Sequence, residues 1–153
     1  MKNKKYIIVE IIPEAISPDK GNLAQISALK LDGLKLVDRF DYRLDESKIS
    51  NNDIKKLISY DKDSFKYLDS TEKLLNEFSN WSEKLPILIF DNSYTNNFLG
   101  NIDNEKISIA SVLDMDYSDD LVDMIIKKYK LKPSNYIVDL LYEALIYHDN
   151  DGK

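Results

Sequence analysis

The sequence feature that most constrains the fold is an apolar run near the start of the chain, Tyr6–Ile12, which Pro13 ends. The run has the length of a strand and is apolar on both faces, as is typical of a strand in the middle of a covered sheet. One carboxylate, Glu10, interrupts it. Because a charged group is costly to bury without a partner, Glu10 needs a structural or chemical reason, and it is the first candidate functional residue.

A hairpin is expected to follow this strand. Residues 24–31 predict a second strand, Asp32-Gly33 a turn, and Leu34–Leu44 a third strand. Asp-Gly between alternating apolar segments is a strong hairpin signal. The sheet is therefore expected to begin with three antiparallel strands.

The remaining chain alternates between helical and strand-like segments. A short helix is expected within Asp45–Tyr60, and the next helix is expected to begin with a capping box formed by Asp69 and Glu72. The later expected elements are a buried strand over Pro86–Phe90, a helix ending near Leu99, a strand over Ile107–Leu113, a helix capped by Ser118 or Asp119, and a last helix ending near Tyr147.

This order of elements predicts the α/β class, with a mixed sheet covered by helices. The chain of 153 residues is long enough to bury a proper core. It shows no internal repeat and no linker. We therefore expect one domain over residues 1–148 and a flexible tail over residues 149–153.

Composition and charge narrow the functional classes. The chain has no cysteine, so disulfides and thiolate metal sites are excluded. It contains no stretch that resembles a signal peptide or a membrane span, so we expect a cytoplasmic location and no membrane partner. The net charge is −6. Since proteins that bind phosphates usually present a basic face, this charge argues against nucleic acid as a ligand without excluding it.

Short motifs occur in a defined order along the chain. They are Glu10-Ile11-Ile12, Ser17-Pro18, Gln25-Ile26-Ser27-Ala28, Phe90-Asp91-Asn92-Ser93-Tyr94, and Ser134 followed by Asp139. Together they resemble the DnaQ-like (RNase T-like, DEDD) family of 3'-5' exonucleases, and the similarity runs from Tyr6 to about Leu145. The resemblance implies a ribonuclease H-like fold, in which a three-strand antiparallel start is followed by parallel strands.

The resemblance also implies site residues, and this sequence departs from the family at most of them. Family members use four carboxylates to hold two divalent ions and a histidine as general base. At the matching positions this chain has Glu10, Ile12, Thr95 and, for the base, Ser134; only Asp139 is unchanged. Isoleucine offers no oxygen to Mg²⁺, and serine is a poor base near neutral pH. We expect Glu10 and Asp139 to be vestigial and the two-metal mechanism to be lost.

Two interpretations of the remaining carboxylates stay open. In one, Glu10 and Asp139 face each other across the first strand and the last helix, Asp91 joins them, and the three hold one ion. In the other, which we favour, Glu10 lies at an exposed strand end and Asp91 caps the helix that starts at Asn92. In either case the resemblance implies that Tyr94 and Asn92 lie at the family's substrate groove.

Other polar residues have simple explanations. His148, the only histidine, is expected to be exposed after the last helix rather than to replace the missing base. The acidic residues between Asp114 and Asp123 do not match the spacing of an EF-hand loop. The lysines between Lys127 and Lys132 complement a helix dipole, so a phosphate site there is the minority interpretation.

The sequence therefore predicts a degenerate exonuclease-like domain that no longer hydrolyses nucleic acid and acts by binding. A protein partner or a second copy of the chain is favoured over a nucleic-acid end, and no cofactor is expected. The alternative is a metal-dependent 3'-5' exonuclease on single-stranded DNA or RNA, which uses Glu10, Asp91 and Asp139 with Mg²⁺ or Mn²⁺.

Overall fold

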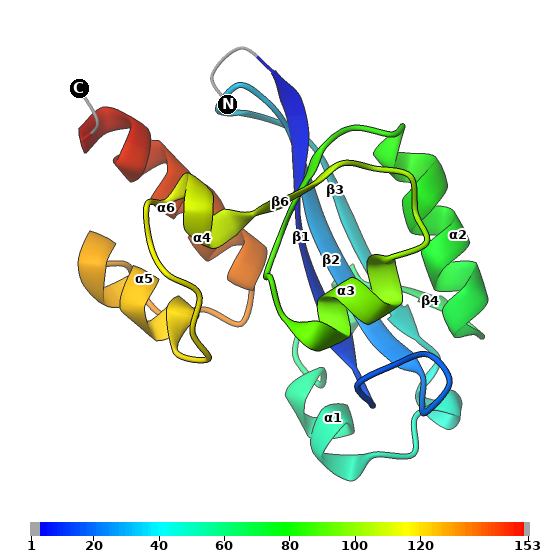
Figure 1. The fold of residues 1–153 in the computed structure, drawn as a ribbon. Coiled ribbons are helices and arrows are strands. Elements are labelled where there is room, and N and C mark those ends of the chain that lie inside the picture. The colour runs from blue at the N-terminus through cyan, green and yellow to red at the C-terminus, as the bar shows by residue number, and fades with distance from the viewer. Residues whose placement is uncertain (1–3, 152–153) are drawn as a thin grey trace.

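A six-stranded mixed sheet forms the centre of the fold, which a computed structural model describes over residues 4–151 (Figure 1). The strand order is β4-β3-β2-β1-β5-β6. The long antiparallel strands are β1 (Lys5–Pro13), β2 (Leu23–Asp32) and β3 (Lys35–Leu44). The short strands β4 (Lys66–Leu68), β5 (Ile87–Ile89) and β6 (Lys106–Ser108) each pair in parallel with a neighbour. The expected antiparallel start followed by parallel strands is confirmed.

Helices cover both faces of this sheet (Figure 1). They are α1 (Asn52–Leu57), α2 (Thr71–Ser82), α3 (Ser93–Leu99), α4 (Ile109–Val112), α5 (Leu121–Tyr129) and α6 (Ile137–Asp151), with short 3₁₀ turns at Glu46–Lys48 and Lys62–Ser64. In Figure 1, α2 and α3 lie on one side of the sheet and α4, α5 and α6 on the other. None of these helices, over the described residues, combines the length and apolarity that crossing a bilayer requires.

The protein has two clusters of buried hydrophobic side chains, one on each face of the sheet, and they explain why β1 is apolar on both faces. Alternate residues such as Ile7 and Val9 pack in one core with side chains of α2 and α3. Tyr6 and Ile8 pack in the other core with side chains of α5 and α6. Successive side chains of a strand point to opposite faces, so a central strand covered on both sides reads as a continuous apolar run.

The turn between β2 and β3 consists of Gly33 and Leu34, one residue later than the predicted Asp32-Gly33, because Asp32 still pairs with Lys35. Gly33 has a φ of 63° and its amide donates to the Lys4 carbonyl at 2.8 Å. Residues with a Cβ are disfavoured at such a φ, so glycine suits this tight connection. The register that follows sets which polar side chains of β1, β2 and β3 share a face.

Several expected boundaries differ from the structure. The α2 helix is capped by Ser70, whose Oγ accepts from the Lys73 amide at 3.1 Å, whereas Asp69 forms an ion pair with the Lys73 side chain at 2.9 Å. The expected Asp69/Glu72 capping box is therefore wrong, because Ser70 is one residue closer to the first helical turn and takes the cap position.

Three other segments have a secondary structure that differs from the one expected from the sequence. The expected strand over Ile107–Leu113 ends at Ser108 and continues as α4, and β4 lies in a segment expected to be an irregular connection. The α6 helix continues through Asp151, so residues 149–151 are helical rather than part of a flexible tail. Residues 152 and 153 lie outside the described residues.

Candidate functional site: a polar row and an apolar cavity

A row of polar side chains crosses one face of the sheet. Glu10 in β1 is opposite Ser27 in β2, which is opposite Asp41 in β3. In the adjacent row, Ile12 is opposite Gln25, which is opposite Arg43. Cross-strand partners share a face, so these side chains lie on the same side of the sheet as Ile8, which packs toward α6.

Glu10 lies beside a cavity of about 610 Å³ at the end of β1. The lining includes Ile12, Tyr60, Tyr94 and Ser134. The Glu10 side chain is half-buried and forms no hydrogen bond or ion pair with any residue that the structure describes. Loss of water around this carboxyl raises its pKa to about 8. Glu10 therefore does not lie at an exposed strand end, and that expectation was wrong.

A second, smaller cavity of about 90 Å³ adjoins Glu10 on another side. Tyr94, Asn92 and Asp119 contribute to its lining. Burial raises the pKa of Tyr94, and the nearby Tyr117, Glu10 and Asp119 raise it further. Glu10 and Tyr94 thus line both cavities.

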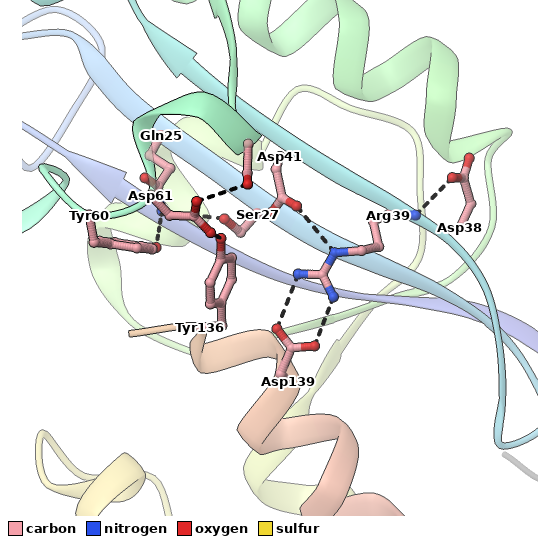
Figure 2. Close-up of polar contacts among 10 residues, drawn as sticks. Gln25, Ser27, Asp38, Arg39, Asp41, Tyr60, Asp61, Tyr136 and Asp139 are labelled. Atoms are coloured by element: carbon pink, nitrogen blue, oxygen red, sulfur yellow. Dashed lines mark hydrogen bonds and ion pairs between the residues drawn. The ribbon is translucent and has the colours of Figure 1, made fainter. Parts of the chain in front are cut away.

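Asp139 is engaged by an arginine of β3 rather than by Glu10 (Figure 2). Arg39 Nη1 donates to Asp139 Oδ1 at 2.8 Å, and Nη2 donates to Oδ2 at 3.1 Å. Arg39 Nε donates to Asp41 Oδ2 at 3.2 Å. Such a bidentate pair has well-defined geometry, so it joins the start of α6 to the face of β3. Glu10 and Asp139, which face each other in the interpretation that we did not favour, have different surroundings in this structure.

Arg43 is almost fully buried in the same polar region, with a relative exposure of 1%. Its Nε donates to Gln25 Oε1 at 2.6 Å, and its guanidinium lies 3.6 Å from the ring centre of Phe65 and 4.7 Å from that of Tyr60. Within the described chain, Arg43 Nη1 and Nη2 and the buried Asp41 Oδ1 have no hydrogen-bond partner. Contact with aromatic faces is the main stabilisation available to this buried cation.

Two tyrosines, Tyr60 and Tyr136, form hydrogen bonds beside the polar row. Gln25 Nε2 donates to Tyr60 Oη at 3.1 Å, and Tyr136 Oη donates to Asp61 (Figure 2). The Tyr136 ring also packs edge-on against Tyr60, at 5.4 Å between ring centres. These contacts join the segment after α1 to the residues just before α6.

The carboxylate expected to cap α3 does not do so. Asn92 Oδ1 accepts from the Thr95 amide at 2.8 Å and is the N-cap of that helix. Asp91 is exposed, and its Oδ1 accepts from Asn96 Nδ2 at 3.1 Å. The expected role of Asp91 as the cap is therefore wrong, since Asn92 is the residue whose oxygen reaches the free amide of the first turn.

The family's other matching positions have structural partners. Thr95 is buried in α3, and Ser134 Oγ accepts from the Tyr136 amide at 3.0 Å. His148 is half-buried rather than exposed as expected: its Nδ1 lies 3.0 Å from Tyr129 Oη, and its Nε2 lies 3.4 Å from Asp114 Oδ2. It lies in α6 and contacts Tyr129 of α5 and Asp114 of the loop before α5.

The residues that the structure brings together do not fit a two-ion centre. Over the part of the chain that the structure describes, no group of three or more His, Cys, Asp or Glu side chains is placed to hold a metal ion. Ile12 offers no oxygen, and Asp139 is bound by Arg39. Glu10, Asp91 and Asp139, the candidate single-ion set, do not gather into one cluster.

The two arginines of this site were not predicted from the sequence. The sequence predicts no role for Arg39, Arg43, Tyr60 or Tyr136. A signal was available in β3, where Arg39, Asp41 and Arg43 alternate. Three charged residues on one face of a strand inside a sheet must find partners, and these partners are the polar groups of β2 and α6.

Comparison with known proteins finds similar folds but no similar sequence. No known family profile and no curated protein sequence matches this chain. Among solved structures, a 3'-exonuclease that recognises the 3' end of a histone mRNA stem-loop has a TM-score of 0.70 and 12% identity, over 98% of this chain and 65% of its own. Product-bound exonuclease I has a TM-score of 0.60 and 12% identity, over 97% of this chain and 43% of its own.

The chain has the fold of the DnaQ-like 3'-5' exonucleases. Exonuclease I also matches in a structure with SSB and the inhibitor CFAM, at a TM-score of 0.58 and 13% identity, over 95% of this chain and 40% of its own. The chain spans less than two thirds of the length of each of these proteins. At such low identity the likeness concerns the fold, and the site must be judged from its own residues.

Proposed function

We propose that this chain is a degenerate DnaQ-like domain that does not hydrolyse nucleic acid and acts as a binding module. The observation that carries the proposal is the engagement of Asp139 by both amino groups of the Arg39 guanidinium. Asp139 is the one residue that the sequence shares unchanged with the family's catalytic set. A carboxylate held by a bidentate arginine has its oxygens directed at that arginine, which competes with any metal ion for them.

The surroundings of Glu10 support the same proposal. A divalent ion needs several oxygen ligands, and Glu10 supplies a single carboxyl group. Its neighbour on the same face, Ile12, offers no second ligand. The cavity lining, as far as the described residues go, contains no lysine or arginine to bind a phosphate.

A protein partner or a second copy of the chain is favoured over a nucleic-acid end. The net charge of −6 opposes binding to a polyanion. Protein contacts also occur with this fold elsewhere, since one similar exonuclease I structure contains SSB. A cytoplasmic location remains part of this proposal.

A nuclease assay tests the proposal. Purified protein is incubated with end-labelled single-stranded DNA and RNA, with Mg²⁺ or with Mn²⁺, beside the double variant Glu10→Gln, Asp139→Asn. Asp123→Asn on the exposed side of α5 is the matched control. We expect no trimming by any of the three proteins. Metal-dependent trimming that the double variant loses and Asp123→Asn keeps would instead establish the alternative, an active exonuclease.

A further inference from the structure

We infer that the 610 Å³ cavity at the end of β1 binds an organic cation with an apolar body, and that Glu10 is its counter-ion. This inference rests on the proposed binding function and names the chemistry of the ligand. It concerns an ammonium or guanidinium group, carried either by a free small molecule or by a lysine or arginine side chain of a protein.

The size and lining of the cavity suit the apolar body of such a ligand. A volume of about 610 Å³ lies in the range of small-molecule sites. Aliphatic side chains from three elements line it, including Ile12 of β1, Leu57 of α1 and Ile137 of α6. Two of the lining residues, Leu57 and Ile16, are 57% and 53% exposed, so apolar surface continues outward from the cavity.

The charged residues that line the cavity favour a ligand with a positive charge. Two carboxylates line the cavity, Glu10 and Glu14. Glu14 Oε1 already accepts from the backbone amides of Ser50 and Asn51, at 2.7 and 2.9 Å, and so holds a loop. Glu10 has no such partner among the described residues. An anionic ligand would meet an unpaired carboxyl group, whereas a cation would supply the partner that Glu10 lacks.

Aromatic rings add to this preference. Tyr60 and Tyr94 line the cavity, and the electron-rich face of a tyrosine attracts a cation within about 6 Å of its centre. Arg43 contacts the Tyr60 ring but does not line the cavity. Tyr94 also lines the neighbouring 90 Å³ cavity together with the acidic residues Glu10 and Asp119. A ligand cation next to Tyr94 would therefore meet both a ring and a negative potential.

Titration calorimetry with matched ligands tests this inference. The probes share one apolar body and differ in charge: 4-phenylbutylammonium, neutral 4-phenylbutanol and anionic 4-phenylbutyrate. The proteins are the wild type, Glu10→Gln, and Glu77→Gln as a control at an exposed carboxylate of α2. We expect the wild type and the control to bind the ammonium at least about tenfold more tightly than the other two probes, a ratio typical of one charge-assisted contact. Glu10→Gln is expected to lose this preference.

Two peptides distinguish the sources of the cation. Acetyl-Leu-Lys-Leu-amide is compared with acetyl-Leu-norleucine-Leu-amide, in which the side chain lacks the ammonium group. Binding of the lysine peptide more tightly than the ammonium probe indicates a protein side chain as the ligand, and the reverse order indicates a free small molecule.

The comparison of probes on the wild type keeps the inference falsifiable even if Glu10→Gln fails to fold. Equal affinity for the three probes, tighter binding of the carboxylate, or no binding of the ammonium would each overturn it. These outcomes are independent of the nuclease assay, because trimming of nucleic acid would overturn the proposed function whatever the cation preference is.

Discussion

Replacing Glu10 by glutamine should change how stability depends on pH. Burial raises the pKa of Glu10 from 4.5 to about 8 in the folded protein. Between these two pH values the folded state keeps a proton that the unfolded state releases, so the free energy of unfolding falls as pH rises. The slope from this one group approaches about 1.4 kcal/mol per pH unit. Between pH 5 and pH 7 the wild type should therefore lose about 2–3 kcal/mol relative to Glu10→Gln.

Urea denaturation at half-unit steps from pH 4.5 to 8.5 measures this difference. Other groups titrate in the same range, so the relevant quantity is the difference between wild type and Glu10→Gln at each pH. The titratable groups around Glu10 are Tyr60, Tyr94, Asp119 and Glu14, which remain in both proteins. Glu77→Gln on the exposed side of α2 should follow the wild type throughout.

A constant stability difference across this pH range would refute the reasoning, because it would place the folded-state pKa of Glu10 at its ordinary value. A gain in stability of the wild type relative to Glu10→Gln as pH rises would refute it more strongly, since it would mean that the folded protein stabilises the carboxylate. Carbon-13 NMR titration of the Glu10 side-chain carboxyl gives the midpoint directly, and we expect it near pH 8.

Two further predictions concern the arginines of β3. In a double-mutant cycle with Arg39→Met and Asp139→Asn, we expect a coupling of about 1 kcal/mol in the free energy of unfolding, modest because both side chains are partly exposed; additive effects in urea denaturation would contradict a stabilising ion pair. Arg43→Lys should destabilise the protein by about 2 kcal/mol, because lysine cannot keep the planar contact with Phe65 or the bond to Gln25. Arg43→Met should cost less, because it removes a buried charge, and a thermal melt in which Arg43→Lys matches the wild type would contradict this account.

The fold was largely predictable because its main signals are local. The apolar run of β1 and the Asp32-Gly33 turn signal depend only on residues near in sequence; β1 is found where it was expected, and the turn is shifted by one residue. The β4 strand was not predictable in this way. Its three residues pair in parallel with the end of β3, so its conformation depends on a contact that the local pattern does not contain.

The candidate site was predictable only in part because its contacts are long-range. Motif positions identified Glu10 and Asp139, but the partner of Asp139 is Arg39, one hundred residues earlier in the chain. Arg43 is buried because Phe65 and Tyr60 pack on its guanidinium, which the spacing of charges in β3 does not reveal. The sequence indicated which groups were unusual, and the packing of α6 and the segment after α1 determined their partners.

The position of Arg39 also explains why Asp139 and Glu10 have different surroundings. In the sheet, β2 separates β3 from β1, so Arg39 and Glu10 belong to strands about 10 Å apart. Ligands of a common Mg²⁺ ion lie about 2 Å from it, which brings their oxygens within about 4 Å of one another. Asp139 is directed at β3, whereas Glu10 borders the cavity at the end of β1. If the chain is a binding module as we propose, the ion pair between Arg39 and Asp139 fixes α6 on the sheet, and Glu10 remains available to a ligand in the cavity.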